Sequence, residues 1–278
     1  MYSLFFTLKC TRYVVISSLK VVQILTNVGR GAFGFVSLHQ HQSGRHVVIK
    51  QIQFEKDCKI NTDALANEVN VLANLKHPNI IAFYSHFIAA DTLNIVMEHA
   101  PHGNLNEYLA KQKTLLSSDE VLHWFCQLLM AVNYLHSQNI LHRDIKPQNI
   151  LLCGANGSIL KLSDFGISKI LDIWSMGCVL YNLVTLKHPF DASNIADLMS
   201  AIMSGQFKEP ISCPIYGDAL CDIIRSMLEQ NWNHRPTTSV LIAHPLIAQN
   251  LYLLKLGPPY PATTHFCTNL TSFQQMTV

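Results

Sequence analysis

Charged side chains are scarce in this sequence. Asp, Glu, Lys and Arg make up 14% of the 278 residues, against roughly 25% in an average soluble domain. The formal net charge is only +2, and the chain has no run of Lys or Arg. Because 49% of the residues are hydrophobic, the composition excludes a disordered chain. The weak positive charge argues against nucleic-acid binding driven by bulk charge, so we expect no nucleic-acid partner.

Long apolar segments are also lacking. A membrane-spanning helix needs about 20 nearly uninterrupted apolar residues, and the first 20 residues come nearest, but Lys9, Arg12 and Lys20 interrupt them. A secretory signal peptide places its basic residues before the apolar segment, whereas here the apolar segment comes first. We interpret residues 1–20 as an atypical N-terminal extension and expect no membrane association. Anchoring through these residues is the alternative.

The common zinc-binding spacings are absent as well. The eight cysteines include no C-x-x-C pair, and the fourteen histidines include no H-E-x-x-H. Scattered cysteines in a chain of this length without a secretory signal are usually reduced and structural. We therefore expect no structural zinc and a cytoplasmic location.

What is present is a change of pattern near residue 98. Alternating apolar and β-branched residues with glycines predict strands over residues 21–52, 80–87 and 93–99, with a helix over 63–75. Helices follow: Ser117 and Glu120 have the spacing of a capping box, and apolar residues predict helices over 173–184, 195–202 and 220–228. The sequence thus predicts an α+β protein with a β-rich lobe over 21–98, a helical lobe over 99–247 and a tail over 248–278. The crevice between two such lobes is a favoured ligand site.

A glycine-rich segment lies between two of the predicted strands. Gly29, Gly31 and Gly34 have the spacing G-x-G-x-x-G, and Val36 follows. Glycines let backbone N–H groups approach phosphate oxygens without an intervening side chain. The dinucleotide-binding fingerprint shares this spacing, but it opens a helix and needs an acidic residue about 20 positions later. Here Lys50 lies at that distance, which favours a phosphate cover together with a lysine.

Lys50 ends the apolar strand predicted over residues 46–50. A lysine that ends a buried strand is costly unless an anion pairs with it. Taken alone, however, the position is better explained by a lysine that reaches solvent with its amine. The nucleotide interpretation needs a carboxylate partner for Lys50, and Glu68 is the candidate.

Two further segments carry polar residues that suit phosphoryl transfer. Asp144 can accept a proton from a hydroxyl nucleophile, Lys146 can neutralise charge on a transferred phosphoryl group, and Asn149 can ligate Mg²⁺ through its amide oxygen. Asp164 lies 20 residues after Asp144 and follows a short predicted strand, which makes it a second metal ligand. Each residue alone could lie in an ordinary surface loop, but their combined order makes coincidence negligible.

Together these segments resemble the signature set of protein kinases over residues 21–246. The resemblance implies the two-lobed kinase fold, with ATP and Mg²⁺ as cofactors and a protein as substrate. It implies that Asp144 is the catalytic base and that Lys146, two residues later, is typical of serine/threonine kinases. It pairs Lys50 with Glu68 and with the α/β-phosphates. It also implies that Asn149 and Asp164 bind the metal. It also implies a nucleotide-binding set that comprises Val28, Gly29, Arg30, Gly31, Ala32, Phe33, Gly34, Val36, Val48, Lys50, the gatekeeper Met97, the hinge residues Glu98, His99 and Ala100, and Leu151.

Within the kinases, the stretches VGRGAFG, HPNI, APHGNL, ILHRDIKPQNILL and DIWSMGCVLYNL are similar to the NIMA-related serine/threonine kinases. That resemblance implies a cytoplasmic location with partners at the cytoskeleton, centrosome or cilium.

The activation segment of a kinase is missing from this sequence. Kinases place an activation loop and an A-P-E motif between D-F-G and the following buried helix, but here Leu171 is followed directly by Asp172. Without this segment a peptide hydroxyl is poorly oriented near Asp144, and we expect Arg143 and Arg235 to lose their usual partners.

We therefore expect a serine/threonine protein kinase whose phosphoryl transfer is impaired and whose nucleotide binding survives better. The alternative is a non-catalytic ATP-binding or interaction module, produced by a skipped exon or a faulty gene model.

Overall fold

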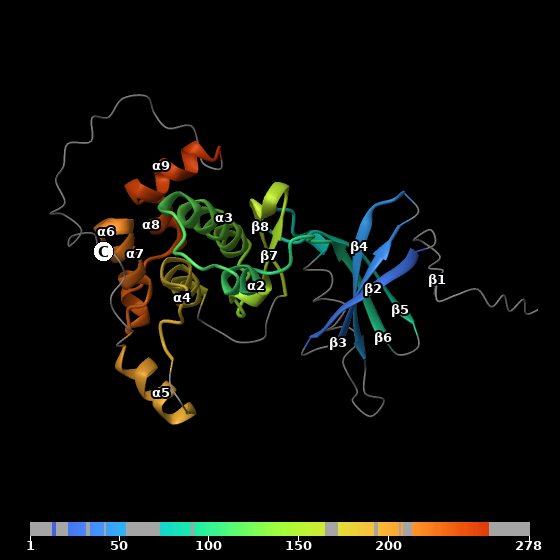
Figure 1. Ribbon diagram of the computed structural model, residues 1–278, viewed down its shortest axis with the longest axis horizontal. Helices are drawn as coiled ribbons and strands as arrows, with labels where there is room; N and C mark the ends of the chain where they lie inside the picture. Colours follow the sequence, from blue (N-terminus) through green and yellow to red (C-terminus); the bar gives the residue numbers. More distant parts are fainter. Residues whose placement is uncertain are drawn as a thin grey trace, which may run out of the picture.

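The computed structural model describes residues 13–14, 22–31, 34–41, 43–53, 73–89, 92–164, 172–191, 194–205, 207 and 213–255. They form a β-sheet lobe and a helical lobe, and a small β-hairpin lies beside the helices on the side of the sheet (Figure 1). This is the α+β architecture that the sequence predicts.

The first lobe is built on a six-stranded antiparallel sheet with the strand order β1-β2-β3-β4-β6-β5. Its strands are β1 (Tyr13–Val14), β2 (Val22–Gly31), β3 (Gly34–Gln40), β4 (His46–Gln53), β5 (Phe83–Ala89) and β6 (Thr92–Glu98). Strand β1 belongs to the predicted N-terminal extension, so two residues of that extension form an edge strand of the sheet beside β2.

The register of the sheet places several predicted nucleotide contacts on one face. Val36 lies opposite Lys50, and Val48 lies opposite both Leu38 and Met97. Directly opposite residues share a face, as do alternate residues along a strand. Val36, Val48, Lys50 and Met97 therefore belong to the same face. The opposite face carries a buried cluster that comprises Val47, Ile49 and Val96, with Phe87 packed against it.

Two predicted elements differ in their extent. Strand β5 begins at Phe83 instead of residue 80, because Ile80 and Ile81 pair with the other lobe: Ile80 bridges Leu162, and the N–H of Ile81 donates to the carbonyl of Leu162 at 3.0 Å. Of the helix predicted over 63–75, residues 73–74 are helical and residues 63–72, which include Glu68, lie outside the described residues.

The second lobe consists of helices and one hairpin. Its helices are α2 (Leu105–Ala110), α3 (Ser118–Ser137), α4 (Asp172–Thr185), α5 (Ile195–Ser204), α6 (Cys213–Tyr216), α7 (Asp218–Met227), α8 (Thr238–Ala243) and α9 (Pro245–Leu253). The hairpin joins β7 (Ile150–Cys153) to β8 (Ile159–Leu162), and short 3₁₀ turns are η1 (Pro147–Asn149), η2 (Ala155–Gly157) and η3 (Trp232–His234).

Helix α3 begins with the predicted capping box. The Ser117 hydroxyl accepts from the N–H of Glu120 at 3.3 Å, and the Glu120 carboxylate accepts from the N–H of Ser117 at 3.0 Å. These bonds satisfy backbone donors that the first helical turn leaves unpaired. The helix is buried along most of its length, which makes it the central element of the lobe.

Helices α4 and α7 form where the sequence predicts them and pack closely together. A Cβ atom built on Gly177 in α4 would lie 2.9 Å from the Cβ of Met227 in α7, so only glycine permits this approach. Helix α9 crosses residue 247, the predicted boundary between the helical lobe and the tail, and Leu251 beyond it is 2% exposed. The core therefore continues past that residue.

Helix α5 forms over the predicted range but buries little of its apolar surface. Met199 is 60% exposed and Met203 is 69% exposed, and the helix projects from the lower end of the helical lobe (Figure 1). Across the described residues, none of the helices combines the length and the apolar character required to cross a bilayer.

Candidate active site

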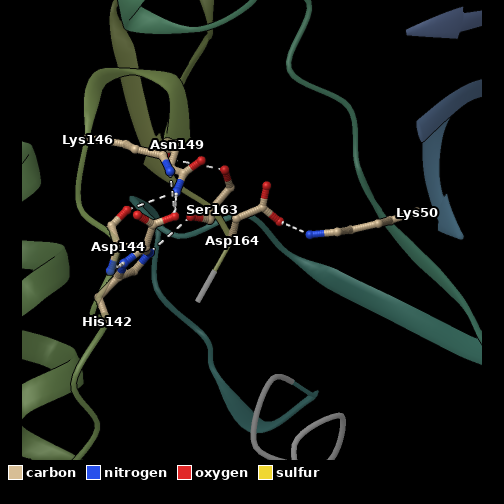
Figure 2. Close-up of polar contacts among 7 residues, drawn as sticks. All are labelled: Lys50, His142, Asp144, Lys146, Asn149, Ser163 and Asp164. Carbon is tan, nitrogen blue, oxygen red and sulfur yellow. Dashed lines mark hydrogen bonds and ion pairs between the residues drawn. The ribbon is translucent and has the colours of Figure 1, made fainter. Parts of the chain in front are cut away.

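Three polar side chains meet in the loop between α3 and β7 (Figure 2). The carboxylate of Asp144 accepts from the amide Nδ2 of Asn149 at 2.7 Å and lies 2.8 Å from the Nζ of Lys146. A second bond joins Asn149 Nδ2 to the backbone carbonyl of Asp144 at 2.9 Å. The structure thus brings together all three polar residues that the sequence predicts for this loop.

Hydrogen bonds from Ser163 fix the backbone of Asn149, and its side chain bonds to Asp144. Asn149 ends η1 and is 7% exposed, and its carbonyl accepts from both the N–H of Ser163 at 2.9 Å and the Ser163 hydroxyl at 3.0 Å. Because its Nδ2 donates to Asp144, its Oδ1 is the amide atom available to a cation. The contact with Ser163 also places Asn149 beside Asp164, the next residue.

The second lobe meets the first through Lys50 and Asp164. The Nζ of Lys50, in β4, forms an ion pair with Oδ1 of Asp164, which follows β8 (Figure 2). The Lys50 side chain is 15% exposed and that of Asp164 is 47% exposed. Lys50 therefore has an anionic partner as predicted, and Asp164 is among its partners. The predicted partner Glu68 lies outside the described residues.

His142 links the loop that carries Asp144 to the segment that carries Asp164. It is fully buried; its Nδ1 accepts from the N–H of Asp144 at 3.3 Å, and its Nε2 donates to the carbonyl of Ser163 at 3.0 Å. Burial lowers the pKa of His142 below its ordinary value, against the opposing effect of nearby carboxylates, Asp172 first among them. A neutral imidazole with its proton on Nε2 satisfies both bonds.

Asp172, the first residue of α4, holds the same loop from the helical side. Its Oδ2 accepts from the N–H of His142 at 2.9 Å and lies 3.0 Å from Nε2 of His136, while its Oδ1 accepts from the N–H of Arg143 at 2.9 Å. Burial alone would raise the pKa of Asp172, but the bonds from His136, Arg143 and His142 together lower it. The sequence places Asp172 directly before the predicted helix over 173–184, but no local pattern indicates this anchoring role.

The glycines of the predicted phosphate cover lie in the paired strands β2 and β3. Gly31 pairs with Gly34 at the end of this strand pair, and Gly29 pairs with Val36 after an irregularity in the register. Val28, Gly29 and Arg30 lie within β2, whereas Ala32 and Phe33 lie outside the described residues. The glycines therefore connect two strands, as the phosphate-cover interpretation requires.

The other predicted nucleotide contacts lie on the sheet, on the hairpin of β7 and β8, and in the segment that follows β6. Val36, Val48 and Met97 share a face with Lys50, and Leu151 lies in β7 of the helical lobe. The predicted hinge follows: Glu98 ends β6, and His99 and Ala100 lead toward α2. The ring of His99 packs edge-on against His46 at 5.7 Å, and burial, followed by the neighbouring His46, lowers the pKa of His99.

Of the two arginines that were expected to lose their usual partners, Arg235 bonds to backbone carbonyls instead of a carboxylate. Arg235 donates from Nε to the carbonyl of Glu229 at 2.7 Å and from Nη2 to the carbonyl of Gln230 at 3.3 Å. The backbone N–H of Arg143 donates to Asp172 at 2.9 Å. Backbone carbonyls close in sequence thus satisfy Arg235 in place of a glutamate.

The chemistry of these donors suits Mg²⁺ with a nucleotide. Mg²⁺ is usually bound by one or two carboxylates together with substrate phosphates, and Asn149 Oδ1 and the Asp164 carboxylate are such hard oxygen donors. Within the described residues, no three His, Cys, Asp or Glu side chains gather as a metal site of their own. The residues present therefore fit a cation that arrives with phosphate ligands.

Comparison with known proteins identifies the family. The family model described as "Protein kinase domain" matches residues 22–171 and 168–247. Among curated proteins, the chain is 40% identical over 260 residues to the serine/threonine-protein kinase Nek8 of Danio rerio and 36% identical over 268 residues to Nek5 of Homo sapiens. These alignments cover 81% and 84% of this chain. The chain spans 37% of the length of each of these relatives.

The family-model match also locates the missing segment, and the Nek8 alignment indicates its length. The two matched stretches of the family model meet at residues 168–171, directly before Asp172. The Nek8 alignment is 260 positions long but uses 81% of 278 residues, which is about 225, so about 35 positions of Nek8 have no counterpart in this chain. The chain therefore belongs to the protein kinase family, and within it is similar to the Nek, or NIMA-related, serine/threonine kinases.

Proposed function

We propose that this chain binds MgATP and transfers its γ-phosphoryl group to serine or threonine hydroxyls of a protein, with an impaired transfer step. The observation that carries the proposal is the joint presence of two ion pairs, Asp144 with Lys146 and Lys50 with Asp164, at one junction between the lobes. Each pair combines a carboxylate with a lysine, which are the groups that phosphoryl transfer requires.

The residues divide the reaction between them. Asp144 accepts the proton of the attacking hydroxyl, and Lys146 neutralises charge on the phosphoryl group as it transfers. Asn149 and Asp164 would hold Mg²⁺, which supplies charge neutralisation at the phosphates when bound. Lys50 is the cation for the α/β-phosphates, and the backbone of Gly29, Gly31 and Gly34 covers them. The remaining members of the predicted set, which are Val28, Arg30, Ala32, Phe33, Val36, Val48, Met97, Glu98, His99, Ala100 and Leu151, enclose the nucleotide.

Binding and transfer depend on different parts of the chain. Nucleotide binding depends on the glycine-rich segment of β2 and β3, on Lys50, on the hinge and on Asp164. Phosphoryl transfer also needs a peptide hydroxyl placed near Asp144, and kinases build the surface that places it from the activation segment. That segment is missing between Leu171 and Asp172. We therefore place the impairment in peptide orientation and expect MgATP binding to be the better preserved property.

A second candidate function is a non-catalytic nucleotide-binding or interaction module. The favouring observation is the abrupt junction at Asp172, where both matched stretches of the family model meet. A skipped exon or a faulty gene model produces such a junction between two intact motifs. In this form the chain would compete for protein partners of a full-length kinase.

Two measurements separate these functions. Phosphoryl transfer from MgATP to a generic basic protein is measured beside the Asp164→Asn variant, which keeps the shape of the side chain and loses its charge. If the unaltered chain transfers phosphoryl groups faster than the Asp164→Asn variant, the kinase function is supported. If the two rates are equal, the kinase function is contradicted and the non-catalytic module is the remaining candidate. Thermal unfolding with MgATP tests both, because a ligand of the folded state must raise the Tm. An unchanged Tm would contradict nucleotide binding in either function.

We also propose a cytoplasmic location with partners at the cytoskeleton, centrosome or cilium, on the resemblance to NIMA-related kinases alone. Fluorescence imaging of the tagged full chain, beside centrosomal and ciliary markers, tests this proposal. Uniform distribution without enrichment at either marker would contradict it.

A further inference from the structure

An ion pair joins the hinge to the strand that leads into Asp164. The Nζ of Lys161, in β8, lies 2.9 Å from Oε2 of Glu98, the last residue of β6. The two side chains are 13% and 23% exposed, so most of the pair is removed from water. Screening by solvent is weaker for such a pair than for an exposed one.

The Glu98 carboxylate also contacts the start of β5. Its Oε2 accepts from the N–H of Ala82 at 3.1 Å, and the N–H of Glu98 itself donates to the carbonyl of Ala82 at 2.9 Å. One carboxylate therefore ties together the residue before β5, the end of β6 and strand β8. The Glu98 carboxylate thus holds together three segments that are separated in the sequence.

The Glu98 side chain points away from the predicted nucleotide contacts Met97 and Val48. Successive residues of a strand point to opposite faces, so Glu98 points away from the face that carries Met97 and Val48. Glu98 lies opposite Val47, a member of the buried cluster on the other face. Its carboxylate is thus committed to Lys161 and Ala82.

Strand β8 is already bonded to the segment before β5. The N–H of Leu162 donates to the carbonyl of Asn79 at 2.9 Å, and the N–H of Ile81 donates to the carbonyl of Leu162 at 3.0 Å. The pair of Lys161 with Glu98 extends this set of contacts as far as the hinge. Because Asp164 lies three residues after Lys161, the pair also limits how far Asp164 can move relative to the hinge.

We propose that Lys161 is a positioning residue for nucleotide binding. By holding Glu98 it sets the separation between the hinge, where adenine binds, and Asp164, where the metal and phosphates bind. A nucleotide that spans both ends requires this separation, whereas a ligand that contacts only the hinge does not. The inference rests on the proposed function, because it presupposes MgATP in this site.

A pair that merely stabilises the fold would behave differently. Removing Lys161 leaves the mostly buried carboxylate of Glu98 without its cation, which is destabilising for any role of the pair. A loss of stability alone therefore does not distinguish a positioning role from a purely stabilising one. The positioning role predicts in addition that the affinity for MgATP falls more than the affinity for adenosine, which lacks phosphates and metal.

The test compares two ligands across four proteins. Calorimetric titrations measure the Kd of MgATP and of adenosine for the unaltered chain and for Lys161→Met, Lys161→Arg and Arg225→Met. Arg225 pairs with Asp222 on the exposed surface of α7, at 2.9 Å, and serves as the matched control. The Tm of each protein is recorded beside the titrations. If Lys161→Met does not fold, Lys161→Gln replaces it.

We expect Lys161→Met to weaken MgATP about tenfold and adenosine less than about twofold. Lys161→Arg, which keeps the charge, restores the MgATP affinity, and Arg225→Met changes neither ligand. Equal changes for both ligands, or no change for MgATP, would overturn the positioning role while leaving the proposed function intact. Failure of the unaltered chain to bind MgATP would instead overturn the proposed function, and this inference with it.

Discussion

The carboxylate of Asp172 accepts a hydrogen bond from the backbone N–H of Arg143 at 2.9 Å. The same carboxylate accepts from His142, so the first residue of α4 fixes two consecutive backbone groups directly before Asp144. Asp172 is the first residue after the junction at which the activation segment is missing. The contact therefore forms even though that segment is absent. The loop that carries Asp144 therefore keeps an anchor in the helical lobe.

Removing the Asp172 carboxylate should destabilise the fold. Asp172→Ala leaves the buried N–H groups of His142 and Arg143 without their acceptor, and we expect a loss of about 3 kcal/mol in the free energy of unfolding. Urea denaturation measures this loss. Asp218→Ala, at the exposed start of α7, is the control and should change the free energy by less than about 1 kcal/mol. Similar losses in both variants would contradict the anchoring role.

The charge of Asp144 should matter for transfer and little for binding. Asp144→Asn keeps the size of the side chain but removes the proton acceptor, so we expect the transfer rate to fall about 100-fold. The Kd of MgATP should stay within about twofold, because the proposed nucleotide contacts lie elsewhere. Single-turnover kinetics and titration calorimetry provide the two values. An unchanged rate would remove Asp144 from the proposed role of base.

Lys50 should matter for the nucleotide. Lys50→Met keeps the aliphatic stem but leaves the phosphates and Asp164 without this cation, so we expect MgATP to bind at least about tenfold more weakly. The rise in Tm at saturating MgATP should shrink accordingly. The exposed Lys187 supplies the control: Lys187→Met should leave both values unchanged. Equal affinity in the Lys50 variant would contradict its proposed contact with phosphate.

Stability should fall in mild acid. Burial lowers the pKa values of His39 and His142 below 6.5, their ordinary value, which the unfolded chain retains. Below about pH 6.5 the unfolded state therefore binds more protons than the folded state, and the free energy of unfolding decreases until the folded-state pKa values are reached. We expect the Tm to fall between about pH 7.5 and pH 5.5.

A histidine variant assigns this effect. His39 is 3% exposed and bonds to the Ser37 hydroxyl at 2.7 Å, so His39→Gln keeps a polar partner but cannot titrate. The dependence of Tm on pH should become shallower in this variant. His188→Gln, on the surface, should retain the full dependence. A Tm independent of pH in the unaltered chain would contradict neutral buried histidines.

The apolar side chains of α5 should contribute little to folding. Met199 and Met203 are mostly exposed, so replacing both by serine should change the free energy of unfolding by less than about 1 kcal/mol. Ile224→Ala, in the buried face of α7, should cost about 3 kcal/mol by the same denaturation assay. A large loss in the methionine variant would show that α5 packs against the lobe.

Local patterns in the sequence predicted the elements well. The capping box of Ser117 and Glu120 involves residues three apart, so the chemistry that starts α3 is readable without any tertiary information. The strand predicted over residues 46–50 likewise forms as part of β4, and the strand period of two places Val48 and Lys50 on one face. Strand β5 was harder, because the pairing of Ile80 with Leu162 in the other lobe decides where it begins.

Contacts between distant residues were not readable in the same way. His136 and Asp172 are 36 positions apart, and Glu98 and Lys161 are 63 apart, so neither pair produces a local spacing signal. The partners of Arg235 could not be predicted either: the sequence pointed only to the loss of its usual side-chain partner, whereas nearby backbone carbonyls bond to the guanidinium.

Under the proposed function, the ion pair of Lys50 with Asp164 would make nucleotide binding an exchange of counter-ions. Before binding, the ammonium and the carboxylate neutralise each other across the two lobes. In the proposed function, Asp164 would hold Mg²⁺ and Lys50 would hold a phosphate, so neither charged group need be desolvated alone. We expect the affinity for MgATP to depend on salt less steeply than in a site with an unpaired lysine. The reason is that Lys50 would exchange one anionic partner, Asp164, for another, a phosphate.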